Sequence, residues 1–184
     1  EVFNTLTIKK KINFVDSIMP KNFFFFKYKE KFFNKIDWDL NKLDEFFNLL
    51  LTKCDNVLFS SDIKNAINKK FIEKYSYVNF NNNEKFDNPN NRNNILYLHD
   101  INIENMLYVI QSSKKSICPH GTVSNISIFC GIPTLALFSY DIKNKIDYHH
   151  EMLSFYEWYG NKSMDFSFLN NDFGKSIRKI STRI

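Results

Sequence analysis

The chain has 184 residues, of which 43% are hydrophobic and 17% aromatic, so it can bury a substantial core as one ordinary domain. No apolar run approaches the roughly 20 residues of a membrane span, and the three cysteines have neither CxxC nor Cys/His spacing. These features argue against a membrane-spanning helix, a disulfide scaffold and a zinc site. They favour buried thiols in a reducing cytosol.

The formal net charge of +5 is concentrated at the front of the chain. Residues 1–35 contain eight lysines and three acidic residues, whereas bases and acids balance over the remainder. A basic front edge suits an anionic partner, which includes a nucleotide, a phosphorylated sugar or a membrane surface. A solvated lysine-rich flank is the alternative interpretation.

The first half of the chain alternates buried strands with amphipathic helices. Four consecutive phenylalanines predict a fully buried strand over Asn22–Tyr28. Leucines and phenylalanines at helical spacing predict a helix over Trp38–Cys54, capped by Asp37 or Asp39. The elements expected next are a strand over Asn56–Ser60, a helix over Asp62–Tyr75 and a weak strand over Tyr77–Phe80.

The second half continues the alternation after an asparagine-rich stretch, Asn81–Asn94, that predicts a loop. Expected strands are Ile95–His99, Ser116–Pro119 and Thr134–Ser139, and expected helices are Asn102–Ser113 and Thr122–Cys130, with two more within 141–158 and at 171–183. Strands separated by helices of this length indicate a Rossmann-like parallel sheet with helices on both faces, an α/β fold. We expect residues 21–170 to form this domain, residues 1–20 to be a basic lead-in, and residues 171–184 to be a C-terminal helix.

The most informative stretch is the turn at 118–122, where a predicted strand ends and a predicted helix begins. In such sheets ligands bind at the carboxyl ends of strands, near a topological switch. The free amides and the dipole at a helix start favour an anion, and His120, Gly121 and Thr122 stand at this start. Asn125 lies about one helical turn further on. Neither a GxGxxG nor a P-loop motif is present.

The segment from Asp100 to Phe138 resembles the C-terminal, donor-binding half of GT-B glycosyltransferases, and most closely glycosyltransferase family 9, the ADP-heptose heptosyltransferases. The family pattern is a leucine-rich helix, an apolar strand, a D-[ST]-G-x-x-H turn, an alanine-rich helix, and a G-[TI]-P strand ending A-L-F. Gly131 to Phe138, Gly-Ile-Pro-Thr-Leu-Ala-Leu-Phe, matches the last strand. His120 replaces the acidic residue, Gly121-Thr122 inverts the [ST]-G pair, and Asn125 replaces the family's histidine.

The resemblance implies metal-independent transfer from a nucleotide-diphosphate sugar to a bacterial surface polysaccharide or lipopolysaccharide. The donor would contact His120, Gly121, Thr122 and Asn125, and Lys35 near Trp38 would correspond, one residue off register, to a basic residue of the family. It also implies a missing N-terminal domain, a glycan or lipid-linked acceptor, and no nucleic-acid partner. The implied location is the cytoplasm, where contact with the inner face of the membrane is compatible with the resemblance. The catalytic residues stay unassigned.

Each candidate also has a structural interpretation that the sequence leaves open. His120 either contacts the ligand or is satisfied by local backbone, and Asn125 either faces the pocket or packs elsewhere. Lys27, Lys29, Lys31 and Lys35 are expected in a loop after the phenylalanine strand, where any of them can neutralise a phosphate. Adjacent histidines on a helix point apart by about 100°, so we expect no metal site at His149-His150. The resemblance implies a nucleotide-sugar substrate and no cofactor.

Two rival functions follow from the same residues. One is a different transferase on this scaffold, for polysaccharide pyruvyl or glycerophosphate groups. The other is a non-catalytic α/β module that binds an anionic partner, nucleic acid included, through its lysine-rich edge.

Overall fold

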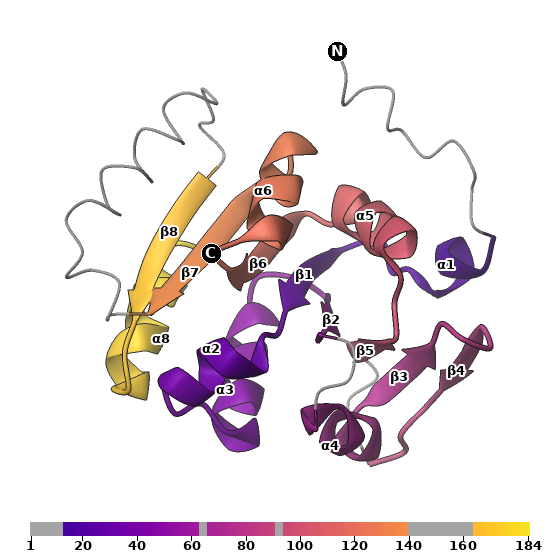
Figure 1. Cartoon of the computed structure of the whole chain (residues 1–184), viewed down its shortest axis with the longest axis horizontal. Helices are drawn as coiled ribbons and strands as arrows, with labels where there is room; N and C mark the ends of the chain where they lie inside the picture. The colour runs from indigo at the N-terminus through magenta and orange to yellow at the C-terminus, as the bar shows by residue number, and fades with distance from the viewer. Residues whose placement is uncertain (1–12, 63–65, 91–93, 140–163) are drawn as a thin grey trace.

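The computed structural model describes residues 13–62, 66–90, 94–139 and 164–184. The described residues form an eight-stranded sheet in the order β4-β3-β5-β2-β1-β6-β7-β8, in which β4 alone pairs antiparallel (Figure 1). The strands are β1 (Phe23–Lys27), β2 (Asn56–Ser60), β3 (Ser76–Asn79), β4 (Glu84–Phe86), β5 (Ile95–His99), β6 (Lys115–Pro119), β7 (Thr134–Ser139) and β8 (Met164–Leu169). The α/β, Rossmann-like fold class expected from the sequence is confirmed.

Helices cover both faces of the sheet because alternate side chains of its strands point to opposite faces. They are α1 (Asn13–Ile18), α2 (Glu30–Lys35), α3 (Leu40–Leu50), α4 (Ile67–Lys74), α5 (Ile103–Ser112), α6 (Thr122–Phe129) and α8 (Phe173–Ser181). Phe24 and Phe26 of β1 belong to the core beneath α2, α3, α4 and α8. Phe23 and Phe25 belong to the core beneath α1, α5 and α6. The phenylalanine run is therefore apolar throughout because both of its faces are buried.

Most predicted elements are present, with boundaries that differ by a few residues. The Asn56–Ser60, Ile95–His99 and Thr134–Ser139 strands have the predicted ends. Of the two proposed caps of the third helix, Asp39 is the N-cap, and its side chain accepts hydrogen bonds from the amides of Asn41 and Lys42. The helix predicted at 171–183 is α8, whereas the helix predicted within 141–158 lies outside the described residues.

Two expectations about local structure were wrong, and one strand was not predicted. The lysines after the phenylalanine strand are not in a loop: Lys27 ends β1, Lys29 is the N-cap of α2, and Lys31 lies within α2. The buried ring of Phe33 holds this short helix against the sheet. The asparagine-rich loop contains β4, an exposed edge strand, and β8 was not predicted at all.

The chain reverses its direction of sheet growth at β1. The strands β2, β3 and β5 build one side of the sheet, and the chain then crosses to add β6, β7 and β8 on the other side. The crevice between the carboxyl ends of β1 and β6 is therefore the topological switch point, where ligands of open α/β sheets bind. Among the described residues, no helix combines the length and the apolar character needed to span a bilayer.

Candidate functional site

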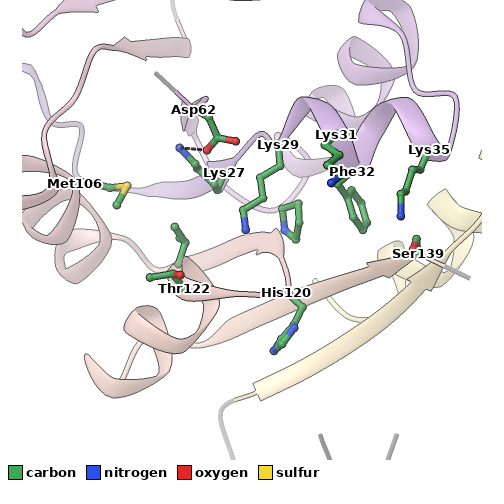
Figure 2. A pocket seen from close by; sticks show the side chains of 12 residues that line it. Lys27, Lys29, Lys31, Phe32, Lys35, Asp62, Met106, His120, Thr122 and Ser139 are labelled. Carbon is green, nitrogen blue, oxygen red and sulfur yellow. Dashed lines mark ion pairs between the residues drawn. The ribbon is translucent and has the colours of Figure 1, made fainter. Parts of the chain in front are cut away.

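A cavity of about 570 Å³ lies at this switch point, and we call it the lysine cavity (Figure 2). Its wall includes the ends of β1, β6 and β7, the helix α2 and the beginning of α6. The lining residues are Lys27, Lys29, Lys31, Phe32, Lys35, Asp62, Met106, Pro119, His120, Thr122, Val123 and Ser139. Among the described lining residues, four lysines face one carboxylate, so this part of the cavity is strongly cationic.

Lys27 is buried, and its charge is already compensated. Its side chain is 8% exposed, and its ammonium donates to the Ser61 carbonyl over 2.6 Å and pairs with Asp62 over 3.2 Å. Burial lowers the pKa of Lys27, while Asp62 opposes that shift. Because Asp62 neutralises Lys27, the remaining positive charge of the cavity comes from Lys29, Lys31 and Lys35.

Lys29 differs from Lys27 because it makes no ion pair with any described residue. Its side chain points from the start of α2 toward the turn that precedes α6 (Figure 2). The ammonium nitrogen lies 2.9 Å from where a Cβ of Gly121 would stand. A cation at this position faces the positive end of the α6 dipole, which is unfavourable without an anion between them.

The turn before α6 and the first residues of this helix, two of which line the cavity, leave backbone amides without intrahelical acceptors. Gly121 has φ +145° and ψ −153°, a conformation reserved for glycine. The Gly121 amide donates to the Ser124 hydroxyl over 2.9 Å, and this hydroxyl donates back to the Gly121 carbonyl over 2.7 Å. The Gly121 amide is thus engaged, whereas the amides of Thr122 and Val123, in the first turn of α6, have no intrahelical acceptor.

His120 lines the cavity, but its ring does not point toward the lysines. In Figure 2 the ring is directed away from the lysine side chains, and it stacks on Phe138 with 4.9 Å between ring centroids. Burial, with the nearby charge of Lys29, lowers the pKa of His120 to about 4. The imidazole is therefore neutral near pH 7 and adds no positive charge to the cavity.

The structure gathers most, but not all, of the residues named from the sequence. His120, Thr122 and Lys35 line the lysine cavity, and Gly121 lies between two of them in the chain. Asn125 is not among the lining residues, and its side-chain oxygen is buried without a hydrogen-bond partner in the described part of the chain. His149 and His150 lie outside the described residues.

Sequence reasoning missed several residues of the wall. Asp62 and Ser139 stand at or just beyond the carboxyl ends of β2 and β7. The rule that strand ends share one edge of a parallel sheet could have found both. Phe32, Met106 and Val123 supply apolar surface, and no sequence signal set these three apart from ordinary core residues.

Together, fold and site define an α/β protein with a lysine-lined cavity at the switch point of its sheet. No protein-family model and no curated protein matches the chain. Among solved structures it is similar to the ADP-heptose LPS heptosyltransferase II of E. coli, with 8% sequence identity and a TM-score of 0.58. The match covers 95% of this chain and 51% of that enzyme, so the chain spans about half of its length. At this identity the likeness shows a shared fold.

Proposed function

We propose that this chain is the donor-binding part of a glycosyltransferase and binds a nucleotide-diphosphate sugar in the lysine cavity. The observation that carries the proposal is the position of Lys29. Its ammonium makes no ion pair with the described residues and lies against the turn at Gly121. The amides of Thr122 and Val123, which follow this turn, have no intrahelical acceptor. A pyrophosphate between the ammonium and these amides would accept hydrogen bonds from both and remove their mutual repulsion.

The same arrangement suits the chemistry of glycosyl transfer. When the bond between the sugar and the β-phosphate breaks, negative charge grows on the phosphate oxygen that leaves. Fixed donors aimed at this oxygen stabilise the transition state more than the ground state. Lys29 and the amides of Thr122 and Val123 are such donors, and none of them requires a metal ion.

One further feature of the lysine cavity supports an organic phosphate over a bare inorganic ion. Phe32, Met106 and Val123 form an apolar part of the wall, which suits the carbon skeleton of a nucleoside or sugar. The likeness to a heptosyltransferase agrees with this choice. We include in the proposal an acceptor of the surface-glycan class and a second, acceptor-binding domain to complete the cleft, so the chain by itself would turn over little or no substrate.

The test is calorimetric titration of the chain with ADP, GDP, UDP and CDP, with inorganic phosphate and single-stranded DNA as comparisons. We expect saturable binding of at least one nucleoside diphosphate, lost in Lys29→Met and in Thr122→Pro, which removes one of the amides. Lys53→Met, a substitution at an exposed lysine between α3 and β2, serves as the matched control. Salt-sensitive binding of DNA that survives Lys29→Met, with no nucleoside diphosphate bound, would instead identify a non-catalytic anion-binding module.

A further inference from the structure

A second, smaller cavity adjoins the lysine cavity at the carboxyl ends of β7 and β8, and we call it the asparagine cavity. It has a volume of about 300 Å³. Its lining residues are Lys35, Ile36, Ser139, Leu169, Asn170, Asn171 and Asp172. Lys35 and Ser139 belong to both walls, so the two cavities are direct neighbours. In Figure 2 the Lys35 side chain points toward Ser139 at this junction.

The loop that forms the far wall is held in place by its own hydrogen bonds. The Asn170 side-chain oxygen accepts from the Asp172 amide over 3.1 Å and from the Ser176 hydroxyl over 3.3 Å. Asp172 caps α8 by accepting from the Lys175 amide over 3.0 Å, and it also pairs with the Lys175 ammonium over 3.0 Å. The wall is therefore pre-formed, which limits the entropy lost when a ligand binds.

Other polar groups of this wall have no hydrogen bond within the described residues. They are the side-chain amide of Asn171, the NH2 group of Asn170 and the hydroxyl of Ser139. An amide and a hydroxyl can each donate and accept, which is the pattern that a ligand hydroxyl needs. Among the described lining residues there is one cation, Lys35, and one carboxylate, Asp172, which also pairs with Lys175, so this cavity concentrates less positive charge than the lysine cavity.

The apolar part of the wall narrows the class of ligand further. Ile36 and Leu169 are aliphatic, and the lining residues that the structure describes include no aromatic ring. A nucleobase would lack a stacking partner here. A compact, uncharged ligand with several hydroxyls matches both the donors and the aliphatic surface.

We propose that the asparagine cavity is a subsite for a glycosyl group next to the phosphate site, with Ser139 and Lys35 at the junction. This inference rests on the proposed function, because the phosphate in the lysine cavity positions the sugar. The glycosyl group can come from the donor itself or from the acceptor glycan. Both present the same hydroxyl chemistry, and the experiment separates them.

The experiment compares three ligands on the whole chain by calorimetry: the nucleoside diphosphate that binds best, its hexose derivative, and a free oligosaccharide added to the protein saturated with that diphosphate. Asn171→Ala and Asn171→Leu are the variants, because Asn171 lines the asparagine cavity and not the lysine cavity, and Asn41→Ala, at an exposed asparagine of α3, is the matched control. Loss of one hydrogen bond predicts about fivefold weaker binding of the hexose derivative, with unchanged affinity for the diphosphate alone.

Each outcome decides the question. Weaker binding of the hexose derivative in the two variants assigns the subsite to the donor sugar, and weaker binding of the oligosaccharide assigns it to the acceptor. Unchanged affinities for both, while the diphosphate still binds, overturn the subsite and leave the proposed function standing. If no nucleoside diphosphate binds, both proposals fail together.

Discussion

Replacing Lys29 with methionine should change ligand affinity and protein stability in opposite directions. A charge-assisted hydrogen bond to a phosphate contributes about 1.5–3 kcal/mol, so the variant should bind a nucleoside diphosphate about 10–100-fold more weakly. The lysine that is lost faces the positive end of α6, and charge–dipole terms are about 0.3–1 kcal/mol. Since methionine keeps the length of the side chain, the free protein should be equally stable or more stable by up to this amount.

Affinity is measured by isothermal titration calorimetry, and stability by urea unfolding followed by circular dichroism. Lys53→Met is the control and should alter neither quantity by more than the effect of one surface charge. A purely structural lysine would give lower stability together with any loss of affinity. If Lys29→Met is destabilised by more than about 1 kcal/mol, or still binds with wild-type affinity, the assignment of Lys29 as an anion ligand is wrong.

Three further predictions test the surroundings of Lys29. The pKa of His120 is about 4 in the folded protein and ordinarily 6.5, so the unfolded state binds the proton more readily and the free energy of unfolding should fall as pH drops from 6.5 to 4. Urea unfolding at pH 7 and at pH 4.5 should show that this loss of stability is smaller in His120→Gln than in the wild type, by up to about 3 kcal/mol. Equal losses in the two proteins would contradict the assigned pKa. Asp62→Asn removes the partner of the Lys27 ammonium, so it should raise diphosphate affinity severalfold. The loss of stability should be only about 1 kcal/mol, because Asp62 is half exposed. A fall in diphosphate affinity, measured by calorimetry, would refute this prediction. Gly121→Ala should lower the free energy of urea unfolding by about 1–3 kcal/mol, since the φ of +145° is strained for alanine and the new Cβ would displace Lys29. Gly174→Ala is the control, because a Cβ there meets only ordinary contacts of 3.7 Å. Equal losses of stability in the two variants would show that the turn is not strained.

The parts of the fold that sequence could predict are those buried on both faces. The run Phe23–Phe26 is apolar at every position, because adjacent side chains enter different cores, and its strand was predicted. The edge strand β4 (Glu84–Phe86) is exposed at all three residues and is held by pairing with β3, so it leaves no hydrophobic pattern to detect. The helix α2 was missed because its lysines suggest a loop, while packing of Phe33 determines its structure.

The location of the site was easier to predict than its chemistry. A strand end followed by a glycine and a helix start predicts open amides, and Thr122 does line the lysine cavity. Sequence spacing could not distinguish Lys27 from Lys29, which are two residues apart. Lys27 points to Ser61 and Asp62 on the neighbouring strand end, and Lys29 points to Gly121. That difference arises from contacts across the sheet that no local pattern records.

The order of the strands explains why this positive charge accumulates at one place. Because the chain reverses its direction of sheet growth at β1, the helix that follows β1 and the helix that follows β6 start side by side at one edge. Their dipoles both direct positive ends to the lysine cavity, and Lys29 adds a full charge between them. Folding stability would favour an acidic residue at this position, as at Asp39 of α3 and Asp172 of α8. A lysine at the shared start of two helices therefore opposes local stability, which is expected where the protein binds an anion.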